Sequence, residues 1–209
     1  MIDFVIPKNN ETEFIEISLK LGVKKIFFLY DFDKYNDDQA KKILNLANNP
    51  KNPEIEIGFI ANGKNLNNAL KQSKLIVVKS CDKDRDFIES KKIKLIYGFE
   101  EIPKKDFLHQ RASGLNHTIC ELAKKNKVAI GFSYSSLLSK NNNSPSLLAG
   151  RMMQNIGLCQ KYKVKTIIGC FSERPFDMRS SYDVIILFMT LGMDGKIAKE
   201  SLTNRDFYG

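Results

Sequence analysis

The residues best suited to bind an anion lie in a basic segment that leads into a predicted helix. Arg111 is followed by Ser113 and Asn116, and the apolar residues after Asn116 recur at helical spacing. Free N–H groups at the start of a helix bind phosphate, and a neighbouring guanidinium adds charge and paired hydrogen bonds. The pattern therefore predicts an anion site at Arg111, Ser113 and Asn116. It is equally consistent with a structural role, in which Ser113 caps the helix and Arg111 pairs with Glu100 or Glu101.

Two more arginines occur in segments where a guanidinium could meet a phosphate. Arg151 and Asn155 are four residues apart and therefore share one face of a predicted helix. That face is either solvated or functional. In the functional case it points into the mouth of the barrel or at a polyanion such as RNA. Asp177 and Arg179 precede the apolar segment 184–191, so they form either a phosphate or partner contact or a structural ion pair.

Groups for hydrolytic chemistry are scarce. The two histidines, His109 and His117, are eight residues apart, which is not the i, i+4 spacing of ligand pairs on a helix. Each is expected to make an ordinary polar contact. A Ser or Cys nucleophile needs a nearby base, and neither histidine lies in a recognisable arrangement with one. We assign no catalytic residue, no metal ligand and no cofactor site.

The net positive charge of the chain favours a polyanionic partner, but most of that charge reflects a lysine-rich composition. The formal net charge is +9 and the pI is about 9.3. Of the 33 basic residues 27 are Lys, so we expect most lysines simply to be solvated. Five of the six arginines lie in the second half, which indicates positions that need a planar, bidentate cation.

Short β-branched and aromatic runs alternate with segments of helical period. Such alternation predicts parallel strands joined by helices, closed as a TIM-like (β/α) barrel or left as an open, doubly wound sheet. We favour an α/β barrel of about seven strands, because Pro7–Asn10 after the first strand lacks a Gly-rich fingerprint. The predicted strands are 2–6, 25–30, 54–60, 74–79, 93–97, 128–132 and 166–170, and the clearest helices are 12–21, 37–47, 116–125 and the one carrying 147–162, started by Ser144 and Pro145.

The length fits one domain over residues 1–209, with 203–209 as a loose tail and 141–145 as a loop. No apolar run is long enough to span a membrane and no signal peptide is evident, so we expect a cytoplasmic protein. The four cysteines are widely separated. We expect them to be reduced residues of the core, with neither a disulfide nor a metal.

The second half contains a series of distinctive segments. In chain order they are Arg111-Ala112-Ser113-Gly114-Leu115-Asn116, Val128–Ser133, Arg151–Asn155, Cys159–Tyr162, Asp177–Arg179, Asp183 and Leu191–Met193. Together these segments resemble ribonuclease P protein component 3, the barrel-like subunit family of archaeal ribonuclease P. The similarity is strong over about residues 106–195 and only architectural before, where Asp3 and Pro7 agree best. One departure is Cys170-Phe171-Ser172, where the family commonly has a Ser-Gly-Ala-like stretch.

The resemblance implies a fold related to the polymerase and histidinol phosphatase barrels, with Asp3-Phe4-Val5 where those enzymes begin a metal cluster. It implies a subunit that binds the ribonuclease P RNA and one partner protein directly, meets pre-tRNA only indirectly, and contacts no membrane. Endoribonuclease chemistry then belongs to the RNA, which holds the Mg²⁺. The expected RNA-binding residues are Arg111, Ser113, Asn116, Arg151, Asn155, Arg179 and Lys196.

Two alternatives remain open at this point. The first is a residual metal-dependent phosphoesterase of the related barrel type, in which Asp3 is a ligand. The second is a protein-assembly module whose lysines do not bind RNA, and it predicts weak RNA binding without a steep salt dependence.

Overall fold

A single parallel sheet forms the centre of the structure. The computed structural model describes residues 1–36, 43, 45–103, 105–106, 111–138 and 144–203. Within them, seven strands are hydrogen-bonded side by side in sequence order. All seven predicted strands are confirmed, with ends that differ by at most two residues. They are β1 (Ile2–Val5), β2 (Lys25–Asp31), β3 (Glu54–Ile60), β4 (Ile76–Lys79), β5 (Leu95–Tyr97), β6 (Ala129–Ser133) and β7 (Thr166–Gly169).

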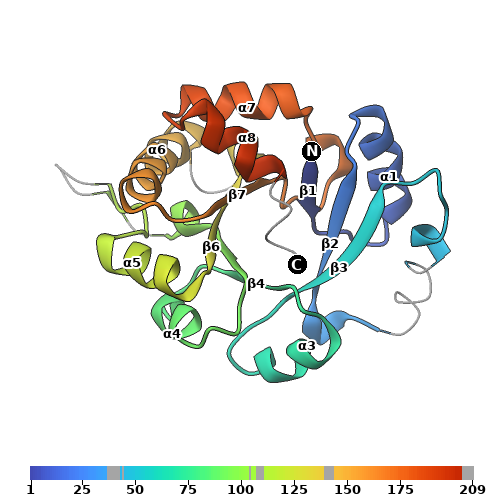
Figure 1. Cartoon of the computed structure of the whole chain (residues 1–209), viewed down its shortest axis with the longest axis horizontal. Coiled ribbons are helices and arrows are strands. Elements are labelled where there is room, and N and C mark those ends of the chain that lie inside the picture. Colours follow the sequence, from blue (N-terminus) through green and yellow to red (C-terminus); the bar gives the residue numbers. More distant parts are fainter. Residues whose placement is uncertain (37–42, 44, 104, 107–110, 139–143, 204–209) are drawn as a thin grey trace.

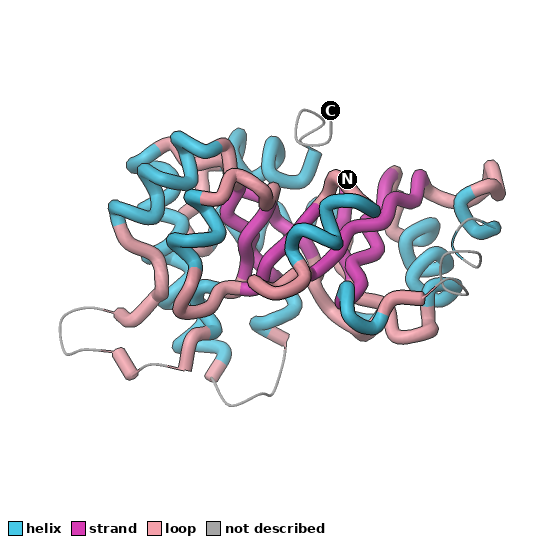
Figure 2. The backbone as a smooth tube through the Cα atoms, turned by 90° about the horizontal axis from the view of Figure 1, so that it is seen from below, coloured by secondary structure: helices cyan, strands magenta, loops and turns pink. Residues whose placement is uncertain are grey.

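Helices surround the sheet on its outer side, as Figures 1 and 2 show. The predicted helix over 37–47 falls mostly outside the described residues, and so do residues 141–143 of the predicted loop 141–145 and residues 204–209 of the predicted tail. Ser144 and Pro145, the last two residues of that loop, are the N-cap and first residue of a helix. Thr203, expected in the tail, ends the last helix instead. The helices are α1 (Glu11–Lys20), α3 (Leu66–Gln72), α4 (Asp84–Glu89), α5 (His117–Asn126), α6 (Pro145–Tyr162), α7 (Ser181–Thr190) and α8 (Gly195–Thr203), with 3₁₀ turns at Phe32–Lys34, Phe99–Glu101, Ser135–Leu137 and Pro175–Asp177.

The two edges of the sheet approach each other and nearly close it into a barrel. The Phe171 amide donates to the carbonyl of Phe4 at 2.7 Å, and the Ile6 amide donates to the carbonyl of Ser172 at 2.9 Å. These bonds join the chain after β7 to β1. The predicted TIM-like barrel is thus confirmed, and the open, doubly wound sheet is excluded by the sequential strand order and by this closure.

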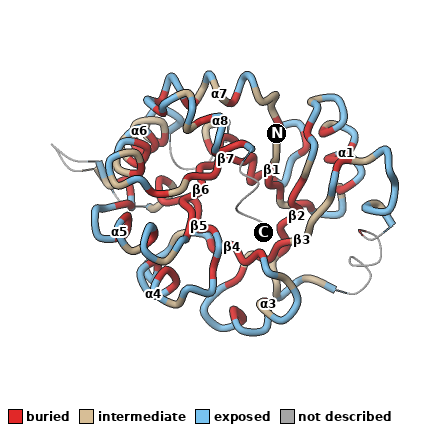
Figure 3. Tube along the Cα trace, viewed as in Figure 1, coloured by how far each residue is buried: buried red, intermediate tan, exposed pale blue. Residues whose placement is uncertain are grey.

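Six of the seven strands are largely buried on both faces, which explains why their sequences are almost continuously apolar. The exception is β3, in which only Gly58 and Phe59 are buried. On β2, Phe27 and Leu29 point into the barrel, while Ile26, Phe28 and Tyr30 pack against the helices. Figure 3 shows the resulting ring of buried strands inside partly exposed helices. The alternation of side chains along a strand therefore builds two separate cores.

Aromatic side chains fill the interior of the barrel. Phe4 stacks on Phe27 with ring centroids 4.9 Å apart and on Phe171 at 5.5 Å, and Phe171 stacks on Tyr97 at 4.4 Å. Gly169 leaves room for this stack, since a Cβ there would lie 2.9 Å from the Phe171 ring. Stacked rings thus occupy the space between β1, β2, β5 and β7.

Local signals in the sequence explain how α6 begins. The Ser144 hydroxyl accepts a hydrogen bond from the Leu147 amide at 3.2 Å, and Pro145 occupies the first turn. This confirms the predicted start of the helix. None of the helices in the described ranges is long and apolar enough to cross a membrane. The cysteines carry free thiols, but Cys81 is exposed, so the expectation that all four lie in the core is wrong for it.

Candidate nucleic-acid interface

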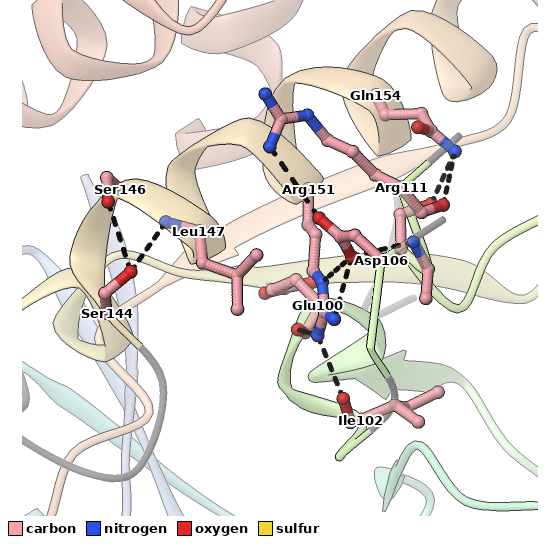
Figure 4. A network of polar contacts seen from close by, with 11 residues as sticks. Glu100, Ile102, Asp106, Arg111, Ser144, Ser146, Leu147, Arg151 and Gln154 are labelled. Carbon is pink, nitrogen blue, oxygen red and sulfur yellow. Dashed lines mark hydrogen bonds and ion pairs between the residues drawn. The ribbon is translucent and has the colours of Figure 1, made fainter. Parts of the chain in front are cut away.

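The Arg151 side chain of α6 is fully buried, and its guanidinium binds the loop that follows β5. Its Nε and Nη2 both donate to Oδ1 of Asp106, each at 2.9 Å. Its Nη1 donates to the carbonyls of Glu100 at 3.1 Å and Ile102 at 2.9 Å. Figure 4 shows the guanidinium lying among these acceptors. Arg151 therefore fixes the course of the chain over 100–106.

Asp106 joins this loop to the segment that carries Arg111. The Ala112 amide donates to Asp106 Oδ1 at 2.9 Å, and Nη1 of Arg111 lies 3.8 Å from Oδ2. Loss of hydration opposes ionisation of Asp106, but the Ala112 amide and Arg151 outweigh it and lower its pKa. Because Arg151 neutralises the Asp106 carboxylate, the charge of Arg111 stays available for another anion.

Two further α6 residues, Gln154 and Asn155, donate hydrogen bonds to the segment 111–113. Nε2 of Gln154 donates to the Ser113 hydroxyl at 2.9 Å and to the carbonyl of Arg111 at 3.3 Å. Nδ2 of Asn155 donates to the carbonyl of Ser113 at 2.9 Å. The residue that caps α5 is Asn116, whose side chain accepts from the Ile119 amide at 2.9 Å. The expected cap at Ser113 is therefore wrong.

Arg111 lies on the surface above α6, where a glycine makes room for it. A Cβ at Gly150 would lie 2.4 Å from Cζ of Arg111, so the guanidinium rests directly against the helix backbone. The Arg111 side chain is 50% exposed, and among the described residues its guanidinium donates no hydrogen bond. The expected pairing with Glu100 or Glu101 is wrong, since Glu101 pairs with Lys79 at 2.7 Å. Arg111 is thus a positioned cation with open donors.

The structure divides the predicted RNA-binding residues of this region into exposed and buried side chains. Arg111 and Asn116 are exposed, whereas Ser113, Arg151 and Asn155 are buried. A buried guanidinium that already donates to Asp106 Oδ1 and to two loop carbonyls has no surface to offer a phosphate. The predicted direct contacts of Arg151, Asn155 and Ser113 are therefore corrected to a positioning role, although the shared face of Arg151 and Asn155 is confirmed.

The other two predicted residues lie elsewhere. Arg179 precedes α7 and donates from Nη1 to the carbonyls of Phe176 at 2.8 Å and Met178 at 2.9 Å. The expected pairing with Asp177 is wrong, because Asp177 binds Arg174 through two hydrogen bonds of 3.0 and 2.9 Å. Exposed Lys196 lies in the first turn of α8. Among the described residues, no shared hydrogen-bond or ion-pair partner connects Arg111, Arg179 and Lys196.

Asp3 does not resemble a metal ligand in this structure. Its carboxylate is buried and accepts hydrogen bonds from the amides of Cys170 at 2.7 Å and Phe4 at 2.8 Å and from the Tyr134 hydroxyl at 2.7 Å. Burial raises the pKa of Asp3 to about 6, although these three donors oppose the shift. No group of three or more His, Cys, Asp or Glu side chains suited to a metal gathers among the described residues.

The sequence of the segment that contains the Arg111 site matches a known protein family. Residues 103–206 match the family described as RNase P subunit p30. The carboxy-terminal half of this chain belongs to the RNase P subunit p30 family. The family match begins three residues before Asp106 and includes all of α5, α6, α7 and α8.

Archaeal relatives support the same family. The chain is 34% identical over 89 residues to ribonuclease P protein component 3 of Thermococcus kodakarensis, covering 43% of this chain and 40% of the relative. It is 29% identical over 107 residues to the protein of that name in Methanosarcina acetivorans, covering 49% and 45%. The matched stretch thus spans less than half of each relative.

Solved structures extend the likeness of the fold to the whole barrel. A chain in a cryo-EM structure of archaeal ribonuclease P with mature tRNA superposes with a TM-score of 0.78 at 20% identity, covering 96% of this chain and 87% of that one. An amidohydrolase superposes with a TM-score of 0.57 at 8% identity, covering 97% and 71%. The fold predicted from the sequence therefore agrees with both neighbours.

Sequence reasoning missed Asp106, Gln154 and Gly150. Asp106 is 45 residues from Arg151, and nothing in its local sequence marks it as an ion-pair partner. Gln154 lies within the Arg151–Asn155 motif, so its place on the helix was a usable signal. Gly150 lies inside a helical segment, and a glycine inside a helix often indicates a close approach by another group.

Proposed function

We propose that this chain is a protein subunit of ribonuclease P, and that it binds the catalytic RNA of that complex through phosphate contacts which include Arg111. The observation that carries the proposal is the coincidence of the family match over 103–206 with the segment that holds Arg111. The chain in the archaeal ribonuclease P structure, with the same fold over 96% of this chain, supports it.

In this proposal the chain contributes charge and position. A folded RNA brings phosphates close together, and a cationic protein lowers their repulsion so that fewer added cations are needed. Arg111 offers a planar fork that matches phosphate, and its loop is fixed by the buried Arg151. The RNA supplies the cleavage chemistry and holds the Mg²⁺.

The partners follow from the same proposal. The chain binds the ribonuclease P RNA and one other protein subunit directly, and it meets pre-tRNA only through the complex. A cytoplasmic location fits this role and stays a prediction. We do not favour the phosphoesterase alternative, since the donors around Asp3 already occupy its carboxylate and aromatic rings fill the barrel interior.

Reconstitution tests the proposal. The cognate ribonuclease P RNA and the other protein subunits are assayed for pre-tRNA cleavage over a series of Mg²⁺ concentrations, with and without this chain. Addition of the chain should permit cleavage at a lower Mg²⁺ concentration, and Arg111→Ala should reverse part of that shift. Cleavage that is indifferent to the chain would overturn the proposal, as would cleavage by the chain without RNA.

A further inference from the structure

Three consecutive turns at one end of the barrel are exceptionally rich in lysine. They are residues 91–94, 124–127 and 161–165, which we call the lysine turns. Together they contain nine lysines and no carboxylate, although the formal net charge of the whole chain is only +9. The turns connect α4 to β5, α5 to β6 and α6 to β7. Each therefore lies at the amino end of a strand, opposite to the end that carries Arg111.

Each lysine turn contains a lysine in the left-handed conformation. Lys91, Lys127 and Lys163 have φ values of 58°, 57° and 55°. At the ends of α1 and α7 the same chain places Gly22 and Gly192 in this conformation, with φ values of 67° and 94°. Glycine adopts it without strain, whereas a residue with a Cβ does so at a cost in free energy. Stability alone therefore does not account for lysine at these three positions.

The three turns are neighbours in space. The Ala129 amide donates to the carbonyl of Lys94 at 3.0 Å, and the Ile130 amide donates to the carbonyl of Lys165 at 2.9 Å. The starts of β5 and β7 thus flank the start of β6, and α4, α5 and α6 follow one another around the ring in Figure 1. Packed helices are about 8 to 10 Å apart, so the turns form one continuous surface roughly 20 Å wide.

The left-handed lysines of this surface are accessible to a ligand, whereas Lys92 already donates to Oδ1 of Asn67 at 2.8 Å. All lysines of the surface are exposed except the half-buried Lys165. Among the described residues, no carboxylate lies within 4 Å of Lys91, Lys127 or Lys163. Glu200 of α8 borders the same region beside Lys163 and Lys165 and reduces the local excess by one charge.

At the opposite end of the sheet, where Arg111 lies, two other basic side chains pair with carboxylates. Arg174, after β7, pairs with Asp177 at 2.9 Å, and Lys79, the last residue of β4, pairs with Glu101 at 2.7 Å. The lysine clusters without carboxylates therefore lie at the amino ends of β5, β6 and β7. A lysine-rich composition by itself would place charge at both ends.

We propose that the lysine turns form a second RNA-binding surface, which takes the phosphate backbone of a structured RNA at the end of the barrel opposite to Arg111. This inference rests on the proposed function and adds a site to it. The left-handed lysines place their charges at the tips of the turns. The surface reads phosphate spacing and not base sequence, because lysine acts as a point charge.

The side chains between the lysines favour RNA over an anionic membrane. Proteins that lie on a membrane surface insert exposed apolar side chains between the lipids. In the lysine turns the apolar residues Ile93 and Val164 are buried, and Tyr162 is half-buried, with the Lys161 ammonium 5.6 Å from the centre of its ring. The surface thus offers charge without a fully exposed apolar side chain, which suits phosphate contacts to RNA.

The decisive variant replaces the three left-handed lysines with glycine, Lys91→Gly together with Lys127→Gly and Lys163→Gly. Glycine suits these backbone positions, so the Tm of the variant should equal or exceed that of the wild type. Affinity for the cognate ribonuclease P RNA should fall by about tenfold or more, and the salt slope should decrease by about two to three units. A purely structural role predicts unchanged binding.

A matched control removes the same charge at the other end of the barrel. Lys8→Gln, Lys34→Gln and Lys64→Gln lie after β1, β2 and β3 and should leave the salt slope within one unit of the wild type. If both triple variants weaken binding equally, only net charge matters and the inference is overturned. It is also overturned if the glycine variant binds RNA normally but loses binding to vesicles of anionic phospholipid. Wild-type protein that does not bind the RNA overturns the proposed function as well.

Discussion

The Arg151 guanidinium donates to a single carboxylate oxygen of Asp106 from both Nε and Nη2, at 2.9 Å each, although the two residues are 45 positions apart. The Arg151 side chain has no exposed surface. Because the same oxygen also accepts from the Ala112 amide, one ion pair connects α6, the loop after β5 and the segment of Arg111. The loop conformation, and with it the position of Arg111, depends on this contact.

Replacement of Arg151 should destabilise the protein strongly. Arg151→Met leaves Asp106 and two loop carbonyls without their donor, and loss of one partner of a buried pair costs about 3 to 5 kcal/mol. Arg151→Lys should recover only part of this, since an ammonium cannot reproduce the fork. Urea denaturation measures both. Arg85→Ala, which breaks an exposed pair with Glu89, is the control and should leave the free energy of unfolding nearly unchanged. An Arg151→Met protein of wild-type stability would contradict the assigned role.

Gly150→Ala should separate RNA binding from stability. The new Cβ would lie 2.4 Å from Cζ of Arg111 and must displace the guanidinium, which is the movable end of a long side chain. Alanine is favoured over glycine inside a helix by roughly 1 kcal/mol, so the fold should tolerate the change. RNA affinity should drop toward that of Arg111→Ala, whose salt slope decreases by about one unit.

Gly157→Ala is the matched control on the same helix. Nothing lies within 4 Å of a Cβ at Gly157, so this variant should gain helix stability and bind RNA as the wild type does. Equal RNA affinity of the Gly150→Ala and Gly157→Ala proteins would show that the position of Arg111 over α6 does not matter for binding.

The free energy of unfolding should fall as the pH rises toward 8, because Glu100 is protonated in the folded state. Burial, assisted by the charge of Glu101, raises the pKa of Glu100 from 4.5 to about 8. The folded state therefore holds a proton that the unfolded chain has lost between these pH values, and stability declines across that window. Neither carboxyl oxygen of Glu100 nor Oδ1 of Asn155 has a hydrogen-bond partner among the described residues.

Glu100→Gln should remove this pH dependence. A neutral amide needs no proton, and its N–H can donate to the unpaired oxygen of Asn155. The variant should gain up to roughly 3 kcal/mol at pH 7, as expected for a carboxyl group with so large a shift. Denaturation at several pH values from 5 to 8 checks the slope. A wild-type stability that rises over this range after correction for the other groups would contradict the prediction.

Asp3→Ala should lower stability without removing any enzymatic activity. Three buried donors, the amides of Phe4 and Cys170 and the Tyr134 hydroxyl, would lose their acceptor, which costs about 1 to 3 kcal/mol for each group left unpaired. Wild-type protein with Mg²⁺ or Mn²⁺ should not hydrolyse phosphate esters. Hydrolysis that disappears in the Asp3→Ala protein would instead favour the phosphoesterase alternative.

The sequence by itself determined the barrel and the identity of its family. Strands buried on both faces need apolar side chains at successive positions, as in Lys25–Asp31, so their signal is local and all seven are predicted. The start of α6 at Ser144 and Pro145 is local for the same reason. The local motif around Arg111 is enough to predict an anion site there.

Only the tertiary structure decided which of the marked residues face solvent. Helical spacing places Arg151 and Asn155 on one face, but whether that face meets water or the loop after β5 depends on a contact with Asp106, 45 residues away. Lys127 and Lys163 look like ordinary surface lysines in the sequence, because a left-handed φ and the proximity of two turns are properties of the folded backbone. Burial and spatial proximity arise from contacts between distant segments, and no local pattern encodes them.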